Sequence, residues 1–236
     1  MQKIMGYIRR AVTEYQMLAD GDRVAVGVSG GKDSVALLAG LVGVRRFLGI
    51  DFSLVAVTLD NQFDGVQGDY GALQALCDEY GITYQLRRTD IGRIIFEQRQ
   101  EQNPCSLCAR MRRGLLHDTA KAAGCNKIAL GHHYNDAVET FLMNLLNEGR
   151  IGCFSPVSYL SRKDLTLIRP LVFAPEREIR NAVRRAQLPV VKSLCPVDGC
   201  TERQWTKEFL ETLEKGHPGV TKRLFGAMQR GHISGW

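Results

Sequence analysis

The chain lacks the features of membrane, secreted and repeat proteins. It has no run of about 18 uncharged apolar residues, the length that a membrane-spanning helix needs. Its first ten residues lack the apolar core of a signal peptide and instead indicate an amphipathic helix. No internal repeat and no low-complexity stretch are present. Because no membrane span or signal core is found, we expect a cytoplasmic protein. Its 236 residues predict one or two domains, and a hydrophobic content of 44% is enough for a substantial core.

The cysteines argue against a disulfide framework. Their number, seven, is odd, and a cytosolic chain keeps its thiols reduced. Cys105 and Cys108 form a C-x-x-C motif, which places two thiolates about one helical turn apart, where both can bind a single metal. The residues alone leave three interpretations open: a thioredoxin-like redox pair, a zinc site completed by Cys195 and Cys200, or an iron–sulfur cluster on three cysteines. Two further cysteines lie in apolar surroundings and are predicted core residues: Cys77 and Cys125.

A glycine-rich segment lies between a predicted strand at residues 23–28 and a predicted helix at residues 35–41. The residues that connect them are Ser29, Gly30, Gly31, Lys32, Asp33 and Ser34. A strand, a glycine turn and a helix bind phosphate in α/β proteins, because the backbone can approach closely and the first N–H groups of the helix point at the anion. Lys32 adds a positive charge. The segment fits neither the G-x-x-x-x-G-K-[ST] loop nor the G-x-G-x-x-G fingerprint.

Predicted strands and helices alternate through the first 150 residues. Further strands are expected at residues 53–59, 83–87 and 127–131, and helices at residues 69–80, 110–123 and 136–146. This alternation predicts an α/β fold whose parallel sheet carries helices on both faces. Ligands of such sheets bind beyond the carboxyl ends of the strands. The glycine-rich segment, Asp60, Gly131 and His132 are therefore expected to meet at one edge.

The pattern changes after about residue 150. Residues 167–171 predict a last strand, residues 175–186 a basic helix, and residues 202–229 two helices divided by a turn. We therefore expect an α/β domain at residues 1–172, which includes the N-terminal helix and the C-x-x-C segment. A helical extension that carries the late cysteines is expected at residues 173–236.

The basic residues are unevenly distributed. The formal net charge is +6, and arginines concentrate in residues 87–113 and again in residues 177–192. Two interpretations stay open from the sequence: solvated faces of two helices, or a surface for a polyanion such as RNA.

Four segments together resemble a known family. In order along the chain they are the glycine-rich segment, residues 104–114 with the C-x-x-C motif, residues 131–140, and Ile168-Arg169-Pro170-Leu171. This combination is similar to the tRNA 2-thiocytidine synthetase family of PP-loop ATP pyrophosphatases, over residues 1 to 205. The resemblance implies an adenine nucleotide alpha hydrolase-like fold. It also implies an enzyme that uses ATP, Mg²⁺ and a [4Fe–4S] cluster on three cysteines to thiolate C2 of an anticodon-loop cytidine.

The resemblance also implies roles for single residues. Residues 29–34 are expected to hold ATP, with Asp60, Gly131 and His132 near the nucleotide. The residues expected to act in catalysis are Lys32, Asp33 and Asp136. The expected cluster ligands are Cys105, Cys108 and Cys195, with Cys200 displaced from the position of a third ligand.

The sequence departs from the family at one position of this site. An amide, Asn135, stands where relatives commonly have an acid, so Mg²⁺ is expected to rest on Asp33 and Asp136. For three neighbouring residues a scaffolding role stays open beside a functional one: His132, His133 and Glu139.

The implied reaction has two steps. The C2 oxygen of cytidine attacks the α-phosphate of ATP, and Lys32, the loop amides and Mg²⁺ stabilise the departing pyrophosphate. Sulfur delivered at the cluster then replaces the adenylate. The implied partners are tRNA and a sulfur donor, either a cysteine desulfurase or free sulfide, with a homodimer left open and no membrane. Two alternatives stay: thiolation of a tRNA uridine, or a zinc-stabilised protein of the lysidine synthetase type that adenylates or binds tRNA.

Overall fold

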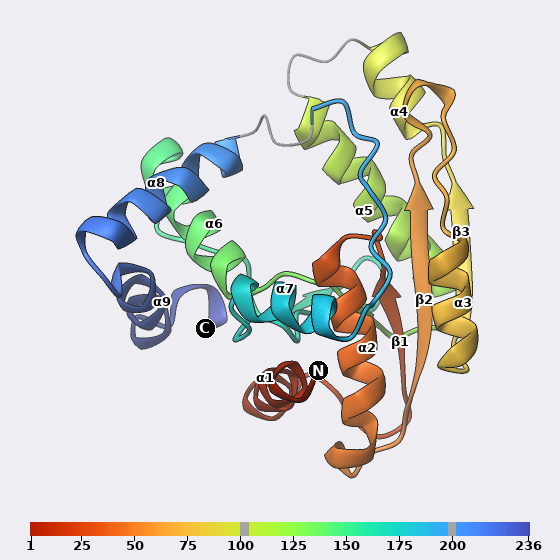
Figure 1. Ribbon diagram of the computed structural model, residues 1–236, viewed down its shortest axis with the longest axis horizontal. Helices are drawn as coiled ribbons and strands as arrows, with labels where there is room; N and C mark the ends of the chain where they lie inside the picture. Colours follow the sequence, from red (N-terminus) through yellow and green to blue (C-terminus); the bar gives the residue numbers. More distant parts are fainter. Residues whose placement is uncertain (100–103, 198–201) are drawn as a thin grey trace.

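The computed structural model describes residues 1–99, 104–197 and 202–236 (Figure 1). Its strands form one sheet in the order β3-β2-β1-β4-β6-β5. The strands are β1 (Asp22–Gly27), β2 (Phe52–Asp60), β3 (Thr83–Arg88), β4 (Lys127–Ala129), β5 (Val157–Leu160) and β6 (Leu165–Ile168). Neighbouring strands are parallel except β5 and β6, which pair antiparallel at the edge.

Helices cover both faces of this sheet. They are α1 (Gln2–Glu14), α2 (Lys32–Leu48), α3 (Gly71–Glu79), α4 (Ile91–Arg93), α5 (Pro104–Ala122), α6 (Tyr134–Asn147), α7 (Glu176–Arg185), α8 (Glu202–Gly216) and α9 (Val220–Arg230). Short helical segments occur at Phe63–Gly65, Ile94–Gln98 and Ile233–Gly235. No helix in the described part of the chain combines the length and apolar character that crossing a membrane requires.

The alternation of side chains along β1 divides the core in two. Val24 and Val26 point to one face, where they join the larger apolar cluster with α1, α2, α3, α6 and α7. Ala25 points to the other face and packs in a smaller cluster beneath α5, with Ala120 as the fully buried helix residue. Because both faces are covered, the middle of β1 and most of β2 are apolar, as in other parallel sheets, whereas the edge strand β3 is largely polar.

The C-terminal helices extend the fold on the side away from β3 (Figure 1). Helix α7 packs against α2 and α1, whereas α8 and α9 pack against α6. After α7 the chain runs back along the N-terminal end of α2 toward the start of α5 (Figure 1). The C-terminal Trp236 is buried, and its ring lies 6.4 Å from that of Tyr15, which follows α1. The predicted boundary at residue 172 stays a prediction.

The structure corrects three details of the predicted elements. The helix expected at residues 110–123 begins at Pro104, so the C-x-x-C motif lies in the first turns of α5. Strand β5 was not predicted; it is a short edge strand, and its Tyr159 is exposed. The last strand ends at Ile168 rather than residue 171, because Pro170 has no N–H to donate to a sheet.

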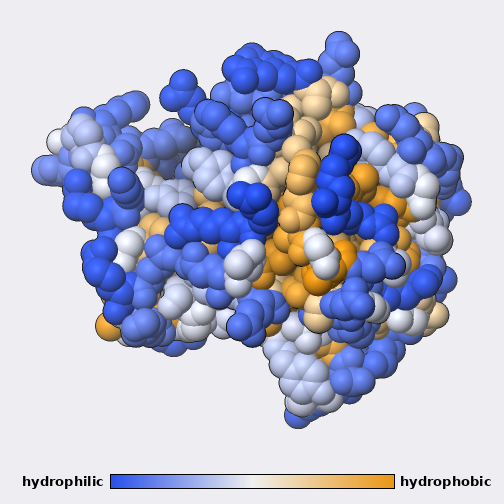
Figure 2. Space-filling model, turned by 90° about the horizontal axis from the view of Figure 1, so that it is seen from below, coloured by the Kyte–Doolittle hydropathy of each residue, from blue (hydrophilic) through white to orange (hydrophobic). Residues whose placement is uncertain are grey.

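The carboxyl ends of β1 and β2 lie toward the upper edge of the sheet in Figure 1, next to the start of α2. Strand β4 pairs parallel with β1, so its carboxyl end points the same way. The opposite end of the molecule is seen in Figure 2, where hydrophilic surface surrounds one apolar area. A groove between α1 and α2 is lined in part by Met5, Val44 and Phe47. The upper edge of the sheet, by contrast, gathers the polar residues that the sequence singled out.

Candidate active site

The glycine-rich segment forms the turn between β1 and α2. Gly30 has φ +87°, a left-handed conformation that side chains other than glycine rarely adopt. Its carbonyl accepts a hydrogen bond from the Val191 N–H at 3.0 Å. A Cβ on Gly30 would lie 2.8 Å from the Val191 Cβ. Glycine is therefore required here both by the turn and by the segment after α7 that lies against it.

Side-chain hydroxyls hold this loop together. Ser34 Oγ donates to the Gly31 carbonyl at 2.8 Å, and Ser29 Oγ lies 3.2 Å from Ser34 Oγ. Lys32 begins α2, so the N–H groups of the first turn face the space above the loop. The loop thus has the local form that binds phosphate, as its sequence predicts.

Gly131 brings the end of β4 against this loop. A Cβ on Gly131 would lie 3.2 Å from both the Asp33 carbonyl carbon and the Ser34 nitrogen. Backbone atoms cannot give way as a flexible side chain can, so only glycine fits without displacing α2. This close approach sets His132 beside the glycine loop, as expected.

A cavity of about 380 Å³ opens above these residues, within the usual size range of small-molecule sites. Its walls come from the ends of β1, β2 and β4, from the start of α2 and from α5. The lining residues are Gly27, Val28, Ser29, Asp33, Ser34, Val57, Leu59, Ala109, Arg112, Arg113, Leu116, His117, Leu130, Gly131, His132 and Asp136. One part is apolar, with Val57 and Leu59, and another part carries the loop and the arginines of α5.

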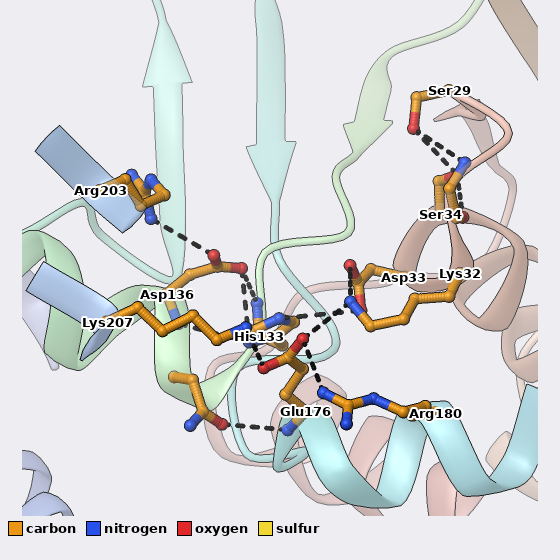
Figure 3. Close-up of polar contacts among 12 residues, drawn as sticks. Ser29, Lys32, Asp33, Ser34, His133, Asp136, Glu176, Arg180, Arg203 and Lys207 are labelled. Atoms are coloured by element: carbon orange, nitrogen blue, oxygen red, sulfur yellow. Dashed lines mark hydrogen bonds and ion pairs between the residues drawn. The ribbon is translucent and has the colours of Figure 1, made fainter. Parts of the chain in front are cut away.

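Lys32 is clamped between two carboxylates (Figure 3). Its Nζ lies 2.9 Å from Asp33 Oδ2 and 3.0 Å from Glu176 Oε1. Burial by itself would lower the pKa of Lys32, but these two carboxylates raise it above its usual value. The ammonium group is therefore charged at neutral pH.

The second oxygen of Asp33 is buried and has no hydrogen-bond partner among the described residues. It lies 3.7 Å from His133 Nε2. A buried carboxylate oxygen without a hydrogen-bond partner is a suitable ligand for a hard cation such as Mg²⁺. The expectation that Asp33 binds Mg²⁺ therefore agrees with the chemistry of this position.

The carboxylate of Asp136 is engaged in hydrogen bonds at the N-terminus of α6. Its Oδ2 accepts from the His133 N–H at 2.8 Å, while His133 Nδ1 accepts from the Asp136 N–H at 3.3 Å. These reciprocal bonds form a capping box. The other oxygen of Asp136, Oδ1, lies 3.3 Å from Arg203 Nη1. The same nitrogen lies 3.4 Å from Oε2 of the buried Glu139. His133 thus has the scaffolding role, and a Mg²⁺ at Asp136 would have to displace Arg203.

Asn135 caps the neighbouring helix. Its Oδ1 accepts from the Glu176 N–H at 3.0 Å, which satisfies an amide of the first turn of α7. An amide oxygen performs this task without adding a negative charge beside Glu176. This contact gives the unexpected residue at this position a structural function.

His132 is held neutral beside the loop. Burial, followed by the nearby positive charge of Arg169, lowers the pKa of His132 to about 4. Its ring packs 5.0 Å from that of Phe154. No residue in the described ranges makes a hydrogen bond to its Nδ1. A neutral imidazole with one unused nitrogen can donate to or accept from a bound ligand.

Asp60 lies at the carboxyl end of β2, but the lining of the cavity does not include it. Its two oxygens accept from the N–H groups of Gln62 and Gly68, at 3.2 and 3.1 Å. It therefore orders the loop that follows β2, and its predicted contact with the nucleotide stays a prediction.

The cysteine site lies next to the cavity. Cys105 is exposed and Cys108 is half-buried on α5, and Cys195 is half-buried on the segment after α7. Burial raises the pKa of Cys108, and Arg112 counteracts this, while the thiols of Cys195 and Cys105 are near enough to raise it further. Figure 1 shows the segment with Cys195 reaching the start of α5.

In residues 1–99, 104–197 and 202–236, no three Cys, His, Asp or Glu side chains are arranged to hold a metal ion. Cys200 lies outside the described residues. Cys77 and Cys125 are buried core residues, as predicted. Cys153 is half-buried, and burial raises the pKa of its thiol to about 11.

The arginine clusters are on the surface near this site. Those of α7 are all exposed: Arg177, Arg180, Arg184 and Arg185. On α5, Arg110 and Arg113 are exposed, and Arg113 also lines the cavity. Of these exposed arginines, Arg113 therefore places positive charge at the cavity itself.

The sequence did not predict three charged residues that contact the site: Glu176, Arg203 and Lys207. Lys207 lies 2.8 Å from Glu176, and the two residues are 31 positions apart. Charged residues on amphipathic helices ordinarily face solvent, so no local signal distinguishes these three.

Several known proteins are similar to this chain in sequence or in fold. A family model described as a PP-loop domain matches residues 5–198. The tRNA-cytidine(32) 2-sulfurtransferase of Citrifermentans bemidjiense is 40% identical over 98% of this chain and 91% of its own length. The enzyme of that name from Geobacter sulfurreducens is 41% identical over 96% and 89%. The solved U34-tRNA thiolase NcsA from Methanococcus maripaludis, with its [4Fe–4S] cluster, has a TM-score of 0.80 and 26% identity, over 97% of this chain and 77% of that one.

Proposed function

The chain belongs to the tRNA-cytidine(32) 2-sulfurtransferase family of PP-loop proteins, and we propose that it uses ATP to replace the C2 oxygen of a tRNA cytidine with sulfur. One observation carries the proposal. A single cavity is bounded on one side by the glycine loop and on the other by α5, the helix with the C-x-x-C motif. Activation by ATP and delivery of sulfur can therefore occur at adjacent positions.

The cavity accounts for the binding of ATP. We propose that the N–H groups at the start of α2 meet the phosphates together with the ammonium of Lys32, the first residue of α2, which does not itself line the cavity. The apolar part of the cavity around Val57 and Leu59 accepts the adenine. The unpartnered oxygen of Asp33 is the ligand that we propose for Mg²⁺. His132, neutral at pH 7, supplies a hydrogen-bonding group that does not add charge beside the phosphates.

The chemistry follows from these positions. The C2 oxygen of cytidine attacks the α-phosphorus, the bond from that phosphorus to the bridging oxygen breaks, and pyrophosphate leaves. Lys32 and the amides of the loop stabilise the negative charge that develops on the leaving group. The C2 oxygen then forms part of an adenylate, which is expelled as AMP when sulfur attacks C2.

Cys105, Cys108 and Cys195 are the residues that we propose to hold the cluster. Thiolates are the ligands that iron–sulfur clusters use, and the C-x-x-C motif places two of them in the first turns of α5. In the described residues the three thiols are not arranged around a metal position, so the proposal requires the segment with Cys195 to close on α5 when the cluster binds. If these three thiolates held the cluster, it would supply iron at which sulfide could be bound for transfer. Ala109, next to Cys108, lines the cavity, so sulfur has a short path to the nucleotide.

The partners follow from the same surface. We propose that the exposed arginines of α5 and α7 contact tRNA phosphates, and that a cysteine desulfurase or free sulfide supplies the sulfur. Every residue named here belongs to one chain, so the proposal holds for a monomer and for a homodimer. We expect the protein to act in the cytoplasm, where tRNA is matured.

Cytidine is favoured over uridine as the target. The relatives of about 40% identity are named for cytidine 32, whereas the solved thiolase named for U34 shares 26%.

Lys32→Ala tests the role of ATP. With tRNA, sulfide and ATP under anaerobic conditions, the wild-type protein is expected to release AMP and pyrophosphate. Lys32→Ala should abolish this release, whereas Lys3→Ala, at a lysine with a 73% exposed side chain, should not change it. Formation of ADP and phosphate by the wild-type protein would overturn the proposed attack at the α-phosphate.

A further inference from the structure

Glu176 is the first residue of α7, and its carboxylate lies among three cations (Figure 3). Oε1 contacts Lys32 at 3.0 Å and Arg180 at 3.3 Å, and Oε2 contacts Lys207 at 2.8 Å. The side chain is only 11% exposed. No sequence motif included Glu176, and the reaction proposed above does not use it.

The position of this carboxylate is fixed from several sides. Asn135 holds its backbone N–H, and Lys207 comes from a different helix, α8. Hydrogen bonds to Lys207 and Lys32 outweigh burial and lower the pKa of Glu176 to about 2. The positive end of the helix dipole favours an acid at this first position as well. Glu176 is therefore a fixed negative charge rather than a mobile surface acid.

Lys32 needs such a partner. A lysine carries its charge on a flexible four-carbon stem, so the ammonium can take many positions unless something holds it. Asp33 adjoins Lys32 in the chain and contacts Nζ from one side. Glu176, on α7, contacts Nζ from another side, as Figure 3 shows. The two together restrict Nζ to one region beside the glycine loop.

We propose that Glu176 is a positioning residue for ATP cleavage, which holds the Lys32 ammonium where charge develops on the departing pyrophosphate. This inference rests on the proposed function, because it needs Lys32 to meet the phosphates. Lys207 and Arg180 balance the charge of Glu176, so the carboxylate orients Lys32 without strongly repelling ATP. Helix α8, which supplies Lys207, thereby becomes part of the support of the active site.

The inference predicts a particular kinetic pattern. In Glu176→Gln, the kcat of tRNA-dependent AMP release should fall at least tenfold, because Lys32 is no longer held in one position. The KM for ATP should stay the same or decrease, because one negative charge beside the triphosphate has been removed. The Kd of an ATP analogue with a methylene group between the α- and β-phosphorus should likewise not increase in calorimetry. Glu178→Gln is the matched control, since Glu178 lies on the same helix and pairs with the exposed Lys3.

Three outcomes decide the matter. An unchanged kcat in Glu176→Gln, or a raised KM and Kd with little effect on kcat, would overturn the inference. If Glu176→Gln does not fold, Glu176→Asp keeps the charge but shortens the reach, and the same fall in kcat is expected from it. If the wild-type protein releases no AMP, the proposed function fails first, so the two failures are distinguishable.

Discussion

Replacing Gly30 by alanine perturbs the point at which the glycine loop meets the segment that carries Cys195. Alanine at φ +87° costs about 1–2 kcal/mol, because a left-handed conformation brings Cβ too close to the backbone. The new Cβ would also lie 2.8 Å from the Val191 Cβ, and such overpacking costs about 1–3 kcal/mol. The expected total is about 2–5 kcal/mol, a large share of the roughly 5–15 kcal/mol that stabilises a typical domain.

Two control variants separate these costs in urea unfolding. Gly21→Ala, at φ +79° with nothing within 4 Å of the new Cβ, should show only the conformational cost of about 1–2 kcal/mol. In a Val191→Gly background the steric cost of Gly30→Ala should disappear, so the double-mutant cycle should give a coupling of about 1–3 kcal/mol. A cost of Gly30→Ala that is equal in both backgrounds would refute the proposed contact between the loop and Val191.

Three further predictions concern His132, Asn135 and the arginines of α7. Burial lowers the pKa of His132 from 6.5 to about 4, so the unfolded chain takes up the proton first as the pH falls. The free energy of unfolding should therefore fall by up to about 3 kcal/mol between pH 6.5 and 4, and urea unfolding of His132→Gln should lack this loss. Asn135→Ala should cost about 1 kcal/mol in thermal unfolding through the lost cap of α7, whereas Asn135→Asp should cost much less. Reversing the charges of Arg184 and Arg185 should weaken tRNA binding and flatten its salt dependence, and unchanged binding would make these arginines solubilising surface only.

The strand, glycine loop and helix at the start of the fold were predictable because their signals are local. An apolar run, two glycines and a second apolar run are read within about twenty residues, and the sheet rule then brings Gly131 to the same edge. The family resemblance added the expectation that Cys105 and Cys108 are cluster ligands. The predicted first residue of α5, 110, was wrong. The polar residues around the C-x-x-C motif lack a helical pattern of apolar residues, although Pro104 is a residue type favoured at the start of a helix.

The partners of the charged residues could not be predicted. The sequence identifies Asp60 and Asp136 as acids after strands, but their oxygens are used by backbone N–H groups whose positions only the folded loops define. Glu176 and Lys207 come together because the fold brings α7, which packs against α2 and α1, beside α8, which packs against α6. This arrangement has no local sequence signal. Strand β5 was not predicted for a similar reason. It is a short, partly exposed edge strand, so its alternation of apolar and polar residues is weak.

Sulfur insertion into tRNA tests the central claim most directly. Protein reconstituted with iron and sulfide without oxygen is incubated with ATP and unmodified tRNA, and the digested nucleosides are measured by mass spectrometry together with iron and zinc content. We predict ATP-dependent 2-thiocytidine from the wild-type protein, and its loss together with iron in the serine variants of Cys105, Cys108 and Cys195. The serine variants of Cys200 and Cys153 should retain both. Equal loss of activity in Cys200→Ser, with one zinc per chain in the native protein, would contradict the account.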